Sequence, residues 1–472
     1  MSVFCLSQTP FSVAATLRLC AGEHSNSVLS MALRRAPRRW PLSLTKESVL
    51  TQDHHGTTGS SVRQISPLKA FMQAEVSSAS LLALGAVVAL LWANSPLASS
   101  YDGLWSHYFG ISLGDWSFKL DVRHWINDGL MTLFFFVVGL EIKRELTKGH
   151  LSNMRAALLP CIAAAGGMLV PALLYLAIAG STEPRGWAIP VATDIALAVG
   201  ALSVVGRRVP TSARVFLLAL AIVDDIGAIA IIAIAYSEGV SFAWLALAVG
   251  SVIATLALQR TAIQSPAPYV VIGVCMWFGL YQAGIHPTIA GVAMGLLAPS
   301  TARRQVWLVE VESEGHSNDA AAHQGDDEQP GGISIVEWLQ HALHPWTSLL
   351  IVPIFALANS GVQISVDGLL EAVQSPITWG IFIGLLVGKP LGVTAATWLA
   401  VRSGTANAPA GASRRHIFGV GSAAGIGFTV AMFITELALT DSSDVANAKL
   451  AILSASVLAA AMSIALLRTS NS

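Results

Sequence analysis

The sequence predicts an all-α polytopic membrane protein, and its composition and the length of its apolar runs support this class. Hydrophobic residues make up 54% of the 472 residues and charged residues only 12%, whereas a soluble domain carries about 25% charged residues. The mean hydropathy is +0.62. Apolar runs of about 18 or more residues recur, and each is long enough to cross the hydrocarbon layer as a helix. A net charge of −1 argues against a nucleic-acid partner, and the four cysteines lack the spacing of a disulfide framework or a zinc site.

About twelve transmembrane helices are expected, within a membrane domain at 75–468. A short β-hairpin is predicted between the first two, from alternating apolar residues around Gly114-Asp115 (Ile111, Leu113, Phe118 and Leu120). Its exposed edge can pair with a second copy of the chain. The apolar segments lie at 76–93, 122–146, 156–180, 186–205, 213–236, 242–259, 268–282, 286–298, 337–361, 377–400, 415–438 and 446–467.

Two polar stretches differ from these segments. Residues 1–70 hold eight Lys and Arg against three Asp and Glu and contain no long apolar run, so we expect a disordered N-terminal extension. Its composition is like that of a transit peptide, but a cytoplasmic tail, or a start codon placed upstream of Met31 or Met72, is the simpler explanation. Residues 301–336 are acidic and polar, which predicts a flexible cytoplasmic loop within the membrane domain.

The distribution of Lys and Arg predicts the orientation. Alternate loops between the segments hold thirteen Lys and Arg on one side and four on the other, and the basic N-terminus lies on the rich side. Because cytoplasmic loops are enriched in these residues, both termini are expected in the cytoplasm.

Asp224 and Asp225 are the least expected residues, because they lie in the middle of an apolar segment. Adjacent residues on a helix point about 100° apart, so one carboxylate can face a cavity and the other a neighbouring helix. Two nearby carboxylates in a low dielectric cannot both ionise cheaply, so we expect the pair to hold a proton or a small cation in competition. The alternative is a structural role, in which both carboxylates form hydrogen bonds to neighbouring helices.

Two helix interruptions are predicted. Pro190 precedes Thr193 and Asp194, whose side chains can satisfy backbone groups freed by a break. Several glycines between Gly419 and Gly427 weaken a second helix, although close helix packing also explains them. Interrupted helices in both halves of a transporter indicate the binding site. Lys389 lies too centrally to reach the interface and is expected to pair with a carboxylate or to release its proton, although a purely structural ion pair is the alternative.

Other ionisable residues lie near helix ends. Asp128 either lines an outer funnel or lies near the interface. Glu141, Lys143, Arg144 and Glu145 form a cluster that is either a solvated helix end or a charged inner mouth. His286, His341 and His344 can titrate near neutral pH, although a structural role is more usual for a lone histidine.

At these residues the sequence resembles the NhaA family of sodium/proton antiporters, with the matching motifs in the family's order over about residues 75–468. The motifs are WIND at 125–128, FFFVVGLEIKRE at 134–145, ATDIA at 192–196, AIVDDIG at 221–227, HPTIAG at 286–291, HALHP at 341–345, FALANSG at 355–361, GKPLG at 388–392 and GIGFT at 425–429. The resemblance implies an inverted-repeat fold with two broken crossing helices. It also implies a homodimer joined partly by a periplasmic hairpin, in the bacterial inner membrane.

The resemblance also implies the roles of individual residues. Asp225 and Asp224 would bind sodium and protons with Thr193 and Asp194 nearby, while Asp194 and Lys389 compensate the broken helices and Lys389 pairs with Asp224. The positions implicated in pH response are Glu141, Arg144, Glu145, His286, His341 and His344. The chain departs from the pattern at Gln340, where the best-known member has an acid, and in the length of both polar stretches.

The function that these residues favour is an electrogenic, pH-regulated antiporter that expels Na⁺ or Li⁺ in exchange for more than one H⁺, without a cofactor. One alternative is an intramembrane aspartyl protease, but such enzymes take their acids from two different helices. A second alternative is a sensor or channel without coupled exchange. Sodium flux independent of an imposed pH gradient would favour that second alternative.

Overall fold

The computed structural model describes residues 67–469 except for 114–115, 238, 262–264 and 300–334. The predicted N-terminal extension and acidic loop therefore lie outside the described residues, apart from their last residues, which begin helices α1 and α11.

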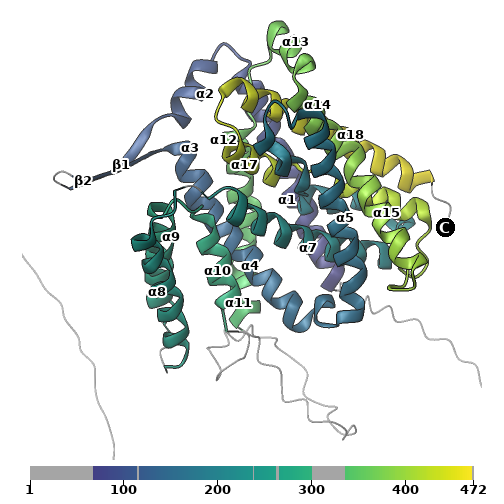
Figure 1. Cartoon of the computed structure of the whole chain (residues 1–472), viewed down its shortest axis with the longest axis horizontal. Helices are drawn as coiled ribbons and strands as arrows, with labels where there is room; N and C mark the ends of the chain where they lie inside the picture. Colours follow the sequence, from purple (N-terminus) through teal and green to yellow (C-terminus); the bar gives the residue numbers. More distant parts are fainter. Residues whose placement is uncertain (1–66, 114–115, 238, 262–264, 300–334, 470–472) are drawn as a thin grey trace, which may run out of the picture. The chain divides into compact units, whose positions relative to one another are not determined.

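Helices long and apolar enough to cross a bilayer dominate the described part of the chain (Figure 1). Nine such spans occur there, and a bent pair makes a tenth. The prediction of a polytopic helical membrane protein is therefore confirmed. The unbroken spans are α1 (Pro67–Ala93), α5 (Met154–Ala179), α7 (Thr211–Ala235), α8 (Phe242–Gln259) and α18 (Ser442–Thr469).

Other spans are composite. The predicted segment 122–146 consists of α3 (Val122–His124), the π-helix η1 (Trp125–Leu130) and α4 (Met131–Lys148). Two more spans also contain a π-helical turn: α11 (Ile335–Trp346), η5 (Thr347–Ile351) and α12 (Val352–Asn359), and then α14 (Pro376–Ile383), η6 (Gly384–Gly388) and α15 (Lys389–Arg402). Such turns are rare and occur mostly near functional sites.

Two of the twelve predicted segments correspond to shorter apolar helices, α9 (Ala267–Gln282) and α10 (Thr288–Leu297). The count of twelve crossings therefore stays a prediction. Two short helices outside the spans, α2 (Ala98–Trp105) and α13 (Val366–Gln374), were not predicted.

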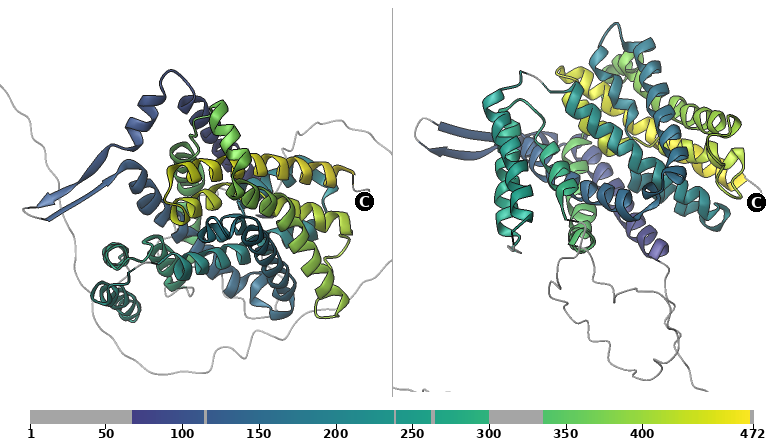
Figure 2. Two further views of the ribbon diagram at one scale, coloured as in Figure 1. Left: turned by 45° about the horizontal axis from the view of Figure 1, so that its top comes forward. Right: turned by 60° about the horizontal axis from the view of Figure 1, so that its bottom comes forward.

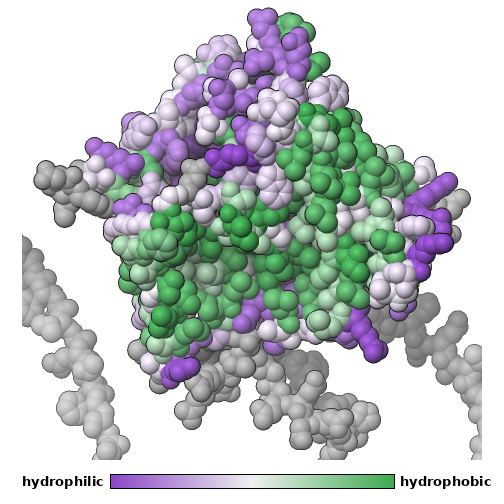
Figure 3. Space-filling view, viewed as in Figure 1, coloured by the Kyte–Doolittle hydropathy of each residue, from purple (hydrophilic) through white to green (hydrophobic). Residues whose placement is uncertain are grey.

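The outer surface of the helices is apolar, as a lipid-facing surface must be. Figure 3 shows hydrophobic side chains across the middle of one face, with polar side chains gathered above and below them. Leu169, Leu173, Ile253 and Val271 are each more than 60% exposed. Because soluble proteins rarely expose apolar patches of this extent, this arrangement fits a multi-pass membrane protein.

Two strands, β1 (Tyr108–Leu113) and β2 (Trp116–Asp121), pair antiparallel where the hairpin was predicted. They extend away from the helices (Figure 2). Ile111 pairs with Phe118, and the turn at 114–115 is not described. The ring of Phe118 contacts Trp125 and Trp277, which anchors β2 to the helices. The periplasmic location of the strands and their role in a dimer stay predictions.

Both predicted helix interruptions are present. The first lies at 192–194, between the 3₁₀-helix η3 (Pro184–Val191) and α6 (Ile195–Val205). The second lies at 425–427, between α16 (Arg414–Ala424) and α17 (Phe428–Ala438), which are bent by 46°. The two interruptions meet, because the Asp194 amide donates to the Ile426 carbonyl at 2.6 Å. The inverted repeat stays a prediction.

Candidate functional site

The two adjacent acids of α7 face different surroundings, as their separation on a helix requires. Asp224 is 1% exposed and Asp225 is 9% exposed. Asp224 Oδ2 accepts a hydrogen bond from Lys389 Nζ at 2.5 Å, whereas the side chain of Asp225 lines a pocket. One acid is therefore neutralised by a cation of the protein, and the other is presented to the pocket.

Lys389 connects α15 to both parts of the site. It lies just after the π-helical turn η6 and is fully buried. Besides Asp224, its Nζ donates to Thr193 Oγ1 at 3.0 Å. The ammonium therefore links the paired acid to the first helix interruption, and an ion pair in so dry a place requires this kind of close partner.

Asp194 joins the two interruptions through one carboxylate. Its Oδ1 accepts from the amide of Leu197 at 3.0 Å and so caps α6. Its Oδ2 accepts from the Thr429 amide at 3.2 Å and from Thr429 Oγ1 at 2.8 Å, at the start of α17. Because helix N-termini carry partial positive charge, a carboxylate is a favourable partner there, and this one contacts two helix starts at once.

The end of α16 lies close to the first interruption and to η6. Thr193 Oγ1 donates to the Ala424 carbonyl at 2.8 Å, at the end of α16. A Cβ on Gly425 would lie 2.5 Å from the Leu385 carbonyl oxygen, so only glycine allows α16 to approach η6 this closely. The glycine run therefore serves close packing at a break, which unites the two readings of that run.

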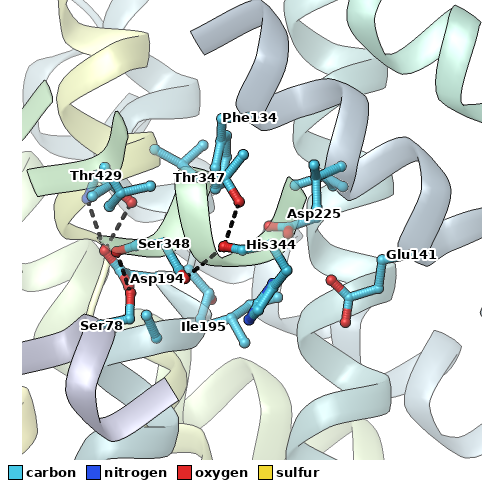
Figure 4. A pocket seen from close by; sticks show the side chains of 16 residues that line it. Ser78, Phe134, Glu141, Asp194, Ile195, Asp225, His344, Thr347, Ser348 and Thr429 are labelled. Atoms are coloured by element: carbon cyan, nitrogen blue, oxygen red, sulfur yellow. Dashed lines mark hydrogen bonds between the residues drawn. The ribbon is translucent and has the colours of Figure 1, made fainter. Parts of the chain in front are cut away.

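The pocket holds about 660 Å³, its open mouth included. Figure 4 shows Asp194 and Thr429 on one side, Asp225 and Glu141 on the other, and His344 between. Three of its lining residues are acidic, whereas Lys389 does not line it. A carboxylate-lined space within a membrane protein favours a cation over an anion.

The residues predicted for pH response are not all together. Glu141 and His344 line the pocket. Glu145 is buried on α4 without lining the pocket, Arg144 is half-buried, and His341 is exposed. The structure thus brings two of the six predicted positions to the site.

Asp128 and His286 lie together, apart from the pocket. Asp128 is 8% exposed, and its Oδ1 is 3.9 Å from His286 Nδ1. The Trp277 indole donates to the Asp128 carbonyl at 3.0 Å, on the π-helical turn η1. The outer funnel assigned to Asp128 stays a prediction, but the residue is more deeply buried than an interfacial position requires.

Several lining residues were not predicted as part of the site: Thr429, Ser78, Thr347 and Ser348. Thr429 lies two residues after the last glycine of the run, so its position after a helix break was an available signal. Ser78 lies in an ordinary apolar helix, and nothing local distinguishes it. The described residues contain no group of three or more His, Cys, Asp or Glu arranged to hold a resident metal ion.

Comparison with known proteins agrees with this geometry. The family model described as Na⁺/H⁺ antiporter 1 matches residues 69–467. A Myxococcus xanthus protein named Na(+)/H(+) antiporter NhaA 2 is 45% identical over 416 residues, which cover 85% of this chain and 88% of that protein. An Oleidesulfovibrio alaskensis protein named Na(+)/H(+) antiporter NhaA is 43% identical over 429 residues, which cover 86% of this chain and 95% of that protein.

Proposed function

Because the chain belongs to the Na⁺/H⁺ antiporter 1 family, we propose that it exchanges Na⁺ or Li⁺ for H⁺ across the membrane at Asp225 and Asp224. The observation that carries this proposal is the difference between the surroundings of the two acids. Asp225 lines the acidic pocket, whereas Asp224 is held by Lys389. A site that takes a cation from water needs an accessible carboxylate, and a site that couples it to protons needs groups whose charge changes in response.

The contacts of this site support a scheme for proton coupling. When no cation is bound, Asp225 holds a proton. A cation that binds its carboxylate displaces this proton to the water of the pocket. If the Asp224 carboxylate then also turns to the cation, Lys389 loses its counter-charge in a dry environment and releases a second proton. Two protons for one Na⁺ or Li⁺ would make the exchange electrogenic.

We also propose pH regulation through the pocket, because Glu141 and His344 line it together with Asp225. Charge changes at these side chains alter the potential that an incoming cation meets. Gln340 is 7% exposed and lies one turn before His344 on α11, so the pH of activation need not equal that of relatives with an acid there. The proposed setting is a homodimer in the bacterial inner membrane with cytoplasmic termini.

Dequenching of a pH-sensitive dye in everted membrane vesicles tests the exchange. Adding Na⁺ or Li⁺ to energised vesicles should release accumulated protons, more strongly at alkaline pH, whereas K⁺ should not. Asp225→Asn should abolish the response because the amide cannot exchange a proton for a cation. Asp367→Asn, a change of an exposed acid on α13, is the matched control and should leave the response intact.

Two outcomes would contradict the proposal. A full Na⁺ response in Asp225→Asn would remove the site assignment. Sodium flux in proteoliposomes that is independent of an imposed pH gradient would indicate a channel. In the same proteoliposomes, driven by a pH gradient alone, a rate of exchange that grows when the membrane potential is clamped with a K⁺ ionophore would support net charge movement.

A further inference from the structure

Three hydroxyl groups line the pocket outside the site described above. Ser78 comes from α1, and Thr347 and Ser348 come from the π-helical turn η5. Ser78 is 1% exposed and Thr347 is 4% exposed. Figure 4 shows Thr347 and Ser348 in the space between Asp194 and Asp225, with Ser78 below Asp194. They therefore lie in the part of the pocket close to both acids.

Each of these hydroxyls donates its proton to a backbone carbonyl. Ser78 Oγ donates to the Ser348 carbonyl at 2.9 Å, and Ser348 Oγ donates to the His344 carbonyl at 2.7 Å. Thr347 Oγ1 donates to the same His344 carbonyl at 3.0 Å. A hydroxyl has one proton and two lone pairs, so a hydroxyl that gives its proton to the backbone offers only lone pairs elsewhere.

The other two hydroxyls of the pocket follow the same rule. Thr193 donates to the Ala424 carbonyl, and Thr429 donates to Asp194. All five hydroxyl-bearing residues that line the pocket therefore give their proton to the protein and keep only oxygen lone pairs, although Thr193 already accepts from Lys389. Such a lining repels anions and suits a hard cation, which takes oxygen ligands.

Asp225 needs help to replace the hydration shell of a cation. The carboxylate of Asp194 already accepts three hydrogen bonds, and Asp224 is held by Lys389. Asp225 alone offers two oxygens. Neutral oxygens nearby can complete the shell without adding a charge that would have to be neutralised when the ion leaves.

We propose that Ser78, Thr347 and Ser348 form a neutral oxygen subsite that binds the partly dehydrated alkali-metal cation on its way to Asp225. The proposal rests on the proposed function and extends it to residues of α1 and η5. The subsite lowers the cost of stripping water from the ion and so determines the apparent affinity for Na⁺ and the discrimination between Na⁺ and Li⁺.

A pair of substitutions at Thr347 separates the oxygen from the volume of this side chain. Thr347→Val keeps the shape and removes the oxygen, whereas Thr347→Ser keeps the oxygen and removes a methyl group. In the vesicle assay, Thr347→Val should raise KM for Na⁺ by about 3-fold to 10-fold, the range for one lost polar contact, with kcat little changed. Its ratio of KM values for Li⁺ and Na⁺ should also change, and Thr347→Ser should resemble the wild type.

The control is Thr255→Val on α8. Thr255 is 1% exposed and donates to the Ser251 carbonyl one turn earlier, so it makes the same kind of bond away from the pocket. This variant should leave both KM values unchanged. If Thr347→Val does not accumulate in the membrane, Ser348→Ala against Ser348→Thr decides the question in the same way.

Two results would overturn the subsite. Unchanged KM values in Thr347→Val would exclude the oxygen as a ligand, and equal losses in Thr347→Val and Thr347→Ser would indicate a packing role. Failure of the proposed function itself is distinguishable, because then the wild-type protein would show no exchange in the same vesicles.

Discussion

Lys389 and Asp224 form an ion pair whose energetic coupling a double-mutant cycle can measure. The Nζ to Oδ2 distance is 2.5 Å, and the two side chains are 0% and 1% exposed. Asp224 Oδ1 has no hydrogen-bond partner among the described residues, so the ammonium is the main partner of this carboxylate. Removing one member of such a pair leaves a buried charge, which costs about 3–5 kcal/mol.

The cycle uses Lys389→Gln, Asp224→Asn and the double variant. Each single variant should lose about 3–5 kcal/mol of unfolding free energy because it leaves the other charge unpaired. The double variant buries no net charge, so it should recover most of the loss. Thermal unfolding of the purified protein in detergent, followed by circular dichroism, measures all three without relying on transport.

Lys449 and Glu436 provide the matched pair. Their Nζ to Oε1 distance is 2.6 Å, but the Glu436 side chain is 24% exposed. Water can therefore replace the lost partner, and we expect a coupling energy well below that of the Lys389–Asp224 pair. The reasoning would be refuted if the double variant of Lys389 and Asp224 had no higher unfolding free energy than the less stable of the two single variants.

Two further substitutions test the junction and the helix packing. Asp194→Asn should destabilise the protein by about 2–4 kcal/mol in the same unfolding assay. The side-chain NH₂ of asparagine would replace one acceptor oxygen and would face the donors of Leu197 or Thr429. Equal stability would contradict the role of this carboxylate at both helix starts. Gly291→Ala should cost about 1–3 kcal/mol because its Cβ would lie 2.1 Å from the Thr132 carbonyl oxygen and force α4 and α10 apart. Gly250→Ala on α8, where a Cβ meets no atom within 4 Å, is the control and should be neutral; a similar loss there would indicate a general effect of the substitution.

Much of the site could be predicted because it rests on local rules. The 100° turn between Asp224 and Asp225 predicts that they face different surroundings, and the structure confirms this. Pro190 and the glycine run indicated both helix interruptions. In each case the cause lies within a few residues of the effect, so the pattern is readable along the chain.

Other features depend on contacts between distant segments. Asp128 and His286 were each singled out, but their proximity requires that the α9–α10 connection pack against η1. Ser78 enters the pocket only because α1 lies beside η5, where it donates to the Ser348 carbonyl. No periodicity along α1 distinguishes that serine from others that face lipid or neighbouring helices.

The carboxylate shared by the two interruptions has a consequence for biosynthesis. Asp194 and Thr429 are separated by 235 residues, so the ribosome finishes the first interruption long before the second exists. Lys389 likewise emerges 165 residues after Asp224. During translation these acids therefore face water or the insertion machinery, and the junction between the two interruptions is complete only after α17 has been synthesised.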